Sequence, residues 1–255
     1  MDISHVLPKP DLNSARIILA VQPHYDDNDI GAGGTLAALA KAGAEIYYLT
    51  VTNDLVGVLD ETLPPQEATL QLEAEQAQAG MLIGVKQQYW LGYPDAGPFD
   101  HFELRGRIIQ HIRMLRPDFI FTVDPWTPYE AHTDRIRTGL AVAEAAILYG
   151  FKRIATRPEI DANYQPHDLL GIAFYHGWVP NTFMDITQTR EKKHTAIDAY
   201  KSQFSQEDFS MLHMAVEIKE RMHAENCTTP GCTHAEAFKV IHPRLLHGVG
   251  ETWKY

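Results

Sequence analysis

Charged side chains crowd into the stretch VQPHYDDNDIGAGGT, residues 21–35. His24, Asp26, Asp27 and Asp29 follow one another closely there, although like charges repel. A bound cation resolves this crowding, because it neutralises the carboxylates that it contacts. An imidazole and a carboxylate three residues apart can meet one cation, and zinc accepts such mixed ligands with an open position for water. The spacing therefore favours His24 and Asp27 as metal ligands and leaves Asp26 free to act as a base.

Two other interpretations compete for the same stretch. The segment Gly31-Ala32-Gly33 resembles the start of a dinucleotide-binding fingerprint, but Leu36 occupies the third glycine position. The inserted carboxylates would also lie beside a pyrophosphate. Asp and Asn commonly cap helices in Gly-rich turns, and such a cap is the one role that we expect for Asp29. We keep the metal interpretation because it also explains the crowding of charge.

The elements that must position this motif follow from the pattern of apolar residues. Strands are predicted over 16–21, 45–52, 88–91 and 118–123, and helices over 35–43, 66–84, 102–115, 134–149, 186–200 and 205–224. The alternation predicts an α/β fold with a mostly parallel sheet and helices on both faces. Polar loops follow the strands at 22–34, 53–54, 91–97 and 125–134. In such a sheet these loops converge at the carboxyl rim, where ligands bind.

Composition limits the class of protein. The chain has 255 residues, of which 45% are hydrophobic, and this suits a single domain over 1–255. The net charge of −11 argues against binding to nucleic acid or anionic lipid. No apolar run is long enough to span a bilayer, and the N-terminal segment lacks the features of a secretory signal. Two cysteines do not make a disulfide framework, so a cytoplasmic location is expected.

The ordered set of motifs resembles the LmbE-like, or PIG-L, family of zinc-dependent N-deacetylases. HYDDNDIGAGGT at 24–35 is similar to the signature H-P-D-D-E-x-x-G-x-G-G-T. Further matches follow in order: LGYPDAG at 91–97, RPDFIFTVDP at 116–125, HTDR at 132–135, MDIT at 184–187, SQ at 202–203 and AEAF at 235–238. The likeness covers nearly the whole chain. It implies the LmbE-like deacetylase fold, a Rossmann-like three-layer sandwich.

The resemblance also implies roles for individual residues. His24 and Asp27 match the family's zinc ligands, and Asp26 matches its general base. His132 matches the histidine that stabilises the tetrahedral intermediate, and Asp134 matches the aspartate that orients it. The implied reaction is hydrolysis of an N-acetyl or other N-acyl group, with release of an amine.

The substrate implied by the resemblance is a small molecule, an N-acetylglucosamine-like sugar or glycoconjugate. Asp95 matches a loop aspartate near the sugar hydroxyls, and Asn53 and Arg135 complete the predicted substrate contacts. The expected cofactor is Zn²⁺ or another divalent metal, and the resemblance implies a homo-oligomer.

The sequence departs from the family pattern at Arg135, where the family has its third zinc ligand, a histidine. A guanidinium stays protonated and offers no lone pair, so it cannot ligate zinc. Other departures are Tyr25, Asn28, Leu72 and Thr133, where the family has proline, glutamate, arginine and proline.

Three explanations are open for the missing ligand. His132 could be the third ligand, since it belongs to the same loop. His176 or His234 could supply the donor instead. Alternatively, the metal is weakly bound or absent and the chain is a catalytically silent sugar-binding protein. In that case the arginine would pair with Asp27 or Asp26, or hold an anionic group of the substrate.

A second group of metal-type residues lies near the C-terminus, in HAENCTTPGCTH at 223–234. It contains His223, Cys227, Cys232 and His234. The spacing is not a common structural-zinc pattern, so we expect a surface loop with free thiols.

Overall fold

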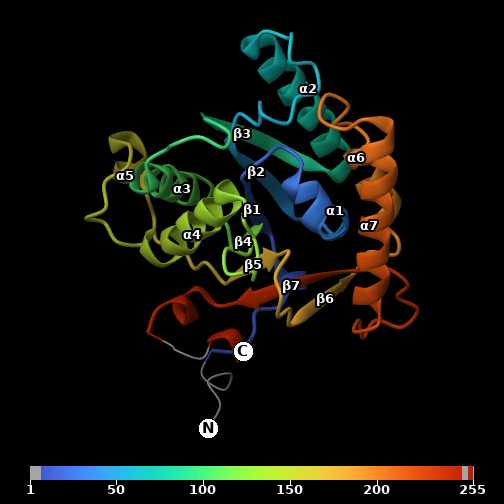
Figure 1. The fold of residues 1–255 in the computed structure, drawn as a ribbon. Coiled ribbons are helices and arrows are strands. Elements are labelled where there is room, and N and C mark those ends of the chain that lie inside the picture. The colour runs from blue at the N-terminus through green and yellow to red at the C-terminus, as the bar shows by residue number, and fades with distance from the viewer. Residues whose placement is uncertain (1–6, 249–251, 255) are drawn as a thin grey trace.

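The computed structural model describes residues 7–248 and 252–254, and it contains one seven-stranded sheet (Figure 1). The strands are β1 (Ile17–Gln22), β2 (Glu45–Thr52), β3 (Val85–Tyr93), β4 (Phe119–Val123), β5 (Gly171–Tyr175), β6 (Thr182–Asp185) and β7 (Ala235–Ile241). The α-helices are α1 (Asp27–Lys41), α2 (Pro65–Ile83), α3 (His101–Leu115), α4 (Thr133–Leu148), α5 (Pro158–Asn163), α6 (Arg190–Ile197) and α7 (Gln206–Ala224). Among the helices so described, none is long and apolar enough to cross a bilayer.

The strand order is β3-β2-β1-β4-β5-β7-β6. The first five strands pair in parallel, and β7 pairs antiparallel with both β5 and β6. The chain therefore reverses its direction of travel across the sheet between the neighbouring strands β1 and β4, and ligands bind at such a switch point. The predicted α/β class with a mostly parallel sheet is confirmed.

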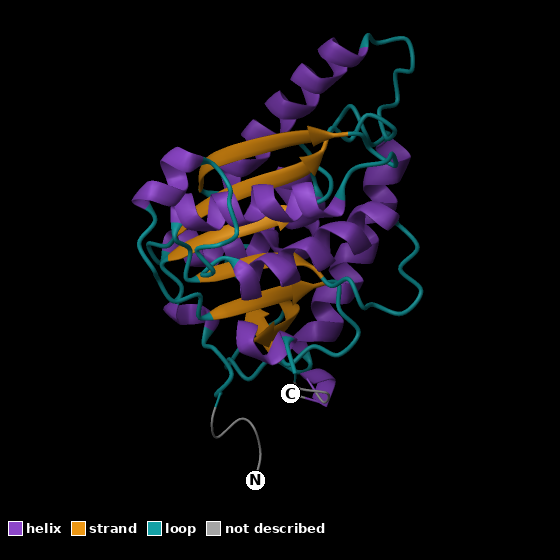
Figure 2. Ribbon diagram, turned by 90° about the vertical axis from the view of Figure 1, so that its left-hand side faces the viewer, coloured by secondary structure: helices purple, strands orange, loops and turns teal. Residues whose placement is uncertain are grey.

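Helices cover both faces of the sheet (Figures 1 and 2). The central strand β1 shows why, because its side chains alternate between two cores. Ile18 and Ala20 belong to the core shared with α1 and α2, whereas Leu19 and Val21 belong to the core shared with α3 and α4. A strand buried on both faces has a continuous run of apolar residues, and the sequence has such a run within residues 16–21.

Helix α1 begins at Asp27, whereas the sequence pattern predicts a start at residue 35. The prediction was wrong because glycines disfavour a helix interior in isolation. Here they are required by packing. A Cβ on Gly31 would lie 2.3 Å from the ring of Tyr175, and one on Gly34 would lie 2.8 Å from Ile186. The glycines therefore let α1 approach the sheet closely, and the whole opening motif after Asp26 becomes helical.

Other differences concern the edges of the elements. Strand β3 runs over Val85–Tyr93, longer than predicted, and α6 covers only Arg190–Ile197 of the predicted 186–200. Helix α7 agrees closely with prediction, and Ser205 and Asp208 form a capping box at its start. Strands β5, β6 and β7 were not predicted.

Candidate active site

A hollow of about 650 Å³ opens at the carboxyl ends of the parallel strands. It is lined by His24, Asp26, Asp27, Ile30, Asp54, Val56, Gly57, Asp95, Ala96, His132, Arg135, His176, Gln203, Phe204, Leu212 and Lys219. The loops after β1, β2, β3 and β4 all contribute, so the predicted convergence of four polar loops is present.

Backbone hydrogen bonds fix the turn that carries the opening motif. The carbonyl of Pro23 accepts from both the N–H and the hydroxyl of Thr52. Asn28 is fully buried, and its amide nitrogen donates to the carbonyl of Ala20 while its oxygen accepts from the Tyr175 hydroxyl. Asn28, which replaces the family's glutamate, therefore has a structural role: its side chain links α1 to β1 and β5 by hydrogen bonds.

His24 is surrounded by carboxylates. Its Nδ1 lies 3.0 Å from Asp27 Oδ2, and its Nε2 lies 3.5 Å from Asp95 Oδ1 and 3.7 Å from Asp134 Oδ2. Burial by itself lowers the pKa of His24, but the carboxylates of Asp134, Asp27 and Asp95 outweigh burial and raise it. Three carboxylates thus converge on the two nitrogens of this imidazole.

Arg135 turns into the site and pairs with Asp27, as one of the open explanations predicts. The distance from its Nη2 to Asp27 Oδ1 is 2.8 Å, and its Nη1 lies 3.5 Å from Glu130. Burial tends to raise the pKa of Asp27, but Arg135 and His24 hold it well below its usual range. Asp27 is therefore an ionised carboxylate with both oxygens engaged.

Asp26 stands at the start of α1, and its carboxyl makes no cap hydrogen bond there. It lines the hollow. Burial, Asp27 and Asp54 together raise the pKa of Asp26 well above its usual value. The same surroundings strengthen the affinity of its carboxylate for a proton.

Two predicted residues of the loop after β4, His132 and Asp134, approach His24. The ring of His132, at the N-cap of α4, meets the His24 ring edge-on at 4.5 Å. Asp134 is fully buried and accepts from the Ala96 N–H at 2.8 Å. Its contacts within the described chain go to His24 and the 95–97 loop, and its orienting of His132 stays a prediction.

Asn53 follows β2 and contacts the Asp95 loop. Its side-chain oxygen accepts from the Asp95 N–H at 3.1 Å, so it positions the Asp95 loop. It is not one of the residues that line the hollow. Asn53 thus supports the Asp95 loop, and its contact with substrate stays a prediction.

Sequence reasoning missed several lining residues. Asp54 has a positive φ of 52° and accepts from the Tyr25 N–H and from Gln203 Nε2. Lys219 on α7 donates to His176 Nδ1 at 3.2 Å. The polar loop after β2 was a signal for Asp54, but no local pattern marks Lys219, because α7 reaches the rim only through tertiary packing.

Of the other candidate third donors, His176 lines the hollow and His234 does not. His176 has a positive φ of 58°, and burial, Lys219 and Arg135 lower its pKa well below the ordinary value. His234 instead lies near Glu217, with 3.9 Å between His234 Nε2 and the carboxylate. The structure therefore leaves His132 and His176 beside the metal-type ligands.

Four side chains in the described chain meet the distance requirement for a shared metal ion. They are His24, Asp95, His132 and Asp134, whose ligand atoms all lie within 4.8 Å of one another. Two buried atoms among them have no hydrogen-bond partner in the described residues, His24 Nε2 and Asp134 Oδ1. Buried polar atoms are normally satisfied, so this donor set fits a divalent cation.

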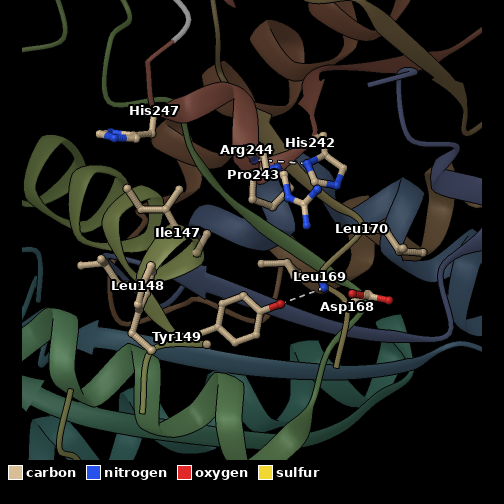
Figure 3. Close-up of a pocket in the computed structure, with 13 residues that line it drawn as sticks. Ile147, Leu148, Tyr149, Asp168, Leu169, Leu170, His242, Pro243, Arg244 and His247 are labelled. Carbon is tan, nitrogen blue, oxygen red and sulfur yellow. Dashed lines mark hydrogen bonds between the residues drawn. The ribbon is translucent and has the colours of Figure 1, made fainter. Parts of the chain in front are cut away.

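A larger hollow of about 820 Å³ lies elsewhere, beside the end of α4 and the short helix η3 (Pro243–Leu246) (Figure 3). The hydroxyl of Tyr149 is occupied there, accepting from Leu169 N–H and donating to the carbonyl of His167. Acid, base and ligand side chains converge at the rim, so we assign the chemistry to the rim hollow.

The C-terminal cysteine loop has the predicted character. Cys227 and Cys232 are free thiols, and each is partly buried. Their sulfurs contact the backbone carbonyls of Phe183 and His234. Within the described residues, this loop does not contribute to the group with metal-ligand distances.

The doubly wound sheet and its rim of histidines and aspartates define a class of α/β protein with a metal-type polar site at the switch point. A family model described as "PIG-L: GlcNAc-PI de-N-acetylase" matches residues 19–146, which contain most of this rim. The chain belongs to this family, and the predicted resemblance is confirmed.

Individual relatives agree with this assignment. A diacetylchitobiose deacetylase of Thermococcus kodakarensis is 32% identical over 196 residues, 76% of this chain and 73% of that protein. A 1D-myo-inositol 2-acetamido-2-deoxy-alpha-D-glucopyranoside deacetylase of Kineococcus radiotolerans is 32% identical over 54% of this chain and 46% of its own length. The structure of N,N'-diacetylchitobiose deacetylase from Pyrococcus horikoshii superposes with a TM-score of 0.90 at 29% identity, covering 99% of this chain and 95% of that one. The predicted deacetylase class thus has direct support from relatives, and the silent alternative has none.

Proposed function

We propose that this chain hydrolyses the N-acetyl group of an N-acetylglucosamine-like sugar or glycoconjugate, with zinc as its metal. The observation that carries the proposal is the donor set His24, Asp95, His132 and Asp134, gathered beside the carboxyl of Asp26. The relatives named above are deacetylases of acetylated amino sugars, which supports the same substrate class.

Zinc at this donor set would act as a Lewis acid that polarises the amide carbonyl and makes water acidic enough to lose a proton near neutral pH. We assign His132 to the ligand role in preference to the oxyanion role, because its ring lies 4.5 Å from that of His24.

Asp26 performs the proton transfers. Its carboxylate takes one proton from water, whose oxygen attacks the acyl carbon of the amide. The C–N bond then breaks, and Asp26 returns the proton to the leaving nitrogen. The products are acetate and a free amine. Base catalysis of this kind contributes a factor of about 10²–10⁴ to the rate.

The remaining rim residues would bind the sugar. The carboxyl of Asp54 faces the hollow and can accept hydrogen bonds from hydroxyl groups. Arg135 and Lys219 also line the hollow and supply cationic donors. The free thiols of Cys227 and Cys232 support a cytoplasmic setting. Assembly into a homo-oligomer stays a prediction.

The test is incubation of the purified zinc-loaded chain with N,N'-diacetylchitobiose, with acetate and free amine measured separately. We expect equal amounts of acetate and amine, loss of turnover after chelation, and recovery when zinc is added back. Absence of acetate from this substrate and from N-acetylglucosamine at full zinc loading would contradict the proposal.

A further inference from the structure

The metal-type donor group differs from the ligand set that the motif resemblance implies. The resemblance pairs His24 with Asp27, whereas the four clustered side chains include His24, Asp95, His132 and Asp134 and leave Asp27 out. The two sets use opposite nitrogens of the same imidazole, because Asp27 faces Nδ1 while Asp95 and Asp134 face Nε2.

Asp27 has no free oxygen to offer. Its Oδ1 is held by Arg135 at 2.8 Å. Its Oδ2 accepts from the His24 backbone N–H at 3.2 Å and lies 3.0 Å from His24 Nδ1, a hydrogen-bond distance. A cation that bound Asp27 would also lie beside the guanidinium, where like charges repel.

The opposite side of the imidazole is open. His24 Nε2 is buried without a hydrogen-bond partner in the described residues, and so is Oδ1 of Asp134, a residue with 0% exposure. Asp95 and Asp134 each have one oxygen held by a backbone N–H, from Val56 and Ala96 respectively, so each keeps a second oxygen for a ligand.

The spacing on this side suits zinc. Two donors that each lie about 2.0–2.2 Å from a tetrahedral zinc ion are about 3.3–3.6 Å apart. His24 Nε2 lies 3.5 Å from Asp95 Oδ1, the oxygen that the Val56 N–H leaves free. It lies 3.7 Å from Asp134 Oδ2, which accepts from Ala96, and the Oδ1 that has no partner in the described residues belongs to the same carboxylate. Two histidines and one carboxylate form the three-ligand set of a catalytic zinc site, which leaves a position open for substrate.

We propose that zinc binds to Nε2 of His24 together with His132 and a carboxylate of Asp95 or Asp134, and that Asp27, held by Arg135, orients His24 from its Nδ1 without contacting the metal. A carboxylate that accepts from the second ring nitrogen of a ligating histidine fixes the tautomer and strengthens the ligand. In this arrangement Arg135 excludes zinc from the Asp27 side of His24, and the zinc binds on the Nε2 side instead. The inference rests on the proposed function for the presence of zinc.

The direct test is NMR of the zinc-loaded wild-type chain with ¹⁵N-labelled histidine rings, in which the His24 signals are identified by their loss in His24→Gln. We expect His24 Nδ1 to carry the proton and Nε2 to be the metal-bound nitrogen. Zinc on Nδ1, or no zinc-dependent change at His24, overturns the inference. Acetate release with zinc on Nδ1 would overturn it while leaving the proposed function intact.

Zinc affinity, measured by competition with a chromogenic chelator, gives a second readout that does not depend on activity. Asp27→Asn should weaken zinc by about 10–100-fold, the usual effect of losing such an orienting carboxylate. Asp95→Asn or Asp134→Asn should weaken zinc more than Asp27→Asn does. Glu159→Gln, on the exposed helix α5, serves as the control for loss of a carboxylate away from the site and should leave zinc affinity unchanged. A larger loss for Asp27→Asn than for both other variants overturns the inference.

Discussion

The approach of α1 to the sheet predicts that Gly31→Ala destabilises the protein. The added Cβ would lie 2.3 Å from Tyr175 Cδ2, whereas carbon atoms in contact prefer about 3.5–4.0 Å. The ring or the helix must therefore move by about 1 Å. Tyr175 is fully buried, and its hydroxyl is held by Asn28, so neither can shift freely.

The expected magnitude follows from two opposing terms. Overpacking of this kind costs about 1–3 kcal/mol, and replacing a helical glycine by alanine returns about 0.5–1 kcal/mol. For a clash this close we expect a net loss of about 1–2 kcal/mol and a fall in Tm of about 2–8 °C. Because His24 precedes α1 and His176 follows Tyr175, a displacement of about 1 Å should also lower kcat by up to about 100-fold.

Thermal denaturation of Gly31→Ala should be compared with that of Gly106→Ala. Gly106 lies in the interior of α3, and a Cβ there would meet nothing within 4 Å. Gly106→Ala should therefore gain about 0.5–1 kcal/mol. The two substitutions are chemically identical, so opposite signs isolate the packing term. A Gly31→Ala protein at least as stable as the wild type would refute the reasoning.

The remaining predictions concern charge and metal. Glu220, which is 2% exposed, lies within ion-pair distance of Lys193, Arg190 and His194. Burial raises the pKa of Glu220, but His194 and Lys193 outweigh burial and lower it to about 2. A lowered pKa gives stability that is present above the unfolded pKa of about 4.5 and is lost as the pH falls toward 2. In urea unfolding, Glu220→Gln should therefore lower the free energy of unfolding by about 3 kcal/mol at pH 7 and by little near pH 2. The partly exposed Glu217 shares Arg190, and Glu217→Gln should cost less than about 1 kcal/mol; equal losses at pH 7 would contradict the difference in burial. Zinc at 100 times its Kd should add about 2.7 kcal/mol to the stability of the apo chain and raise Tm by about 5–11 °C in calorimetry, and an unchanged Tm would argue against a folded-state metal site.

The sequence was most informative where burial is simple. β1 and β2 are covered on both faces, so their apolar runs predicted them closely. The start of α1 could not be predicted, because glycine is a poor helix former and its advantage here depends on Tyr175 and Ile186, which are far away in the sequence.

The candidate site was predicted only in part, because its geometry also depends on contacts between residues that are far apart in the sequence. The motif placed His24, Asp26 and Asp27 at the rim, and the pairing of Arg135 with Asp27 was one of several alternatives that the sequence left open. Which nitrogen of His24 faces which carboxylate depends on how three loops are placed relative to one another. No local sequence pattern indicates this placement. Lys219 lines the hollow because of the tertiary packing of α7, which the local sequence does not indicate.

The central claim is that Asp26 is the base of a metal-dependent deacetylase, and the most direct test is kcat of Asp26→Asn at equal zinc content. Glu159→Gln, on the exposed helix α5, controls for loss of a carboxylate away from the site. The account predicts that Asp26→Asn keeps zinc and fold while kcat for acetate release falls by about 10²–10⁴, and that Glu159→Gln matches the wild type. A zinc-loaded, folded Asp26→Asn protein with kcat close to that of the wild type would contradict it.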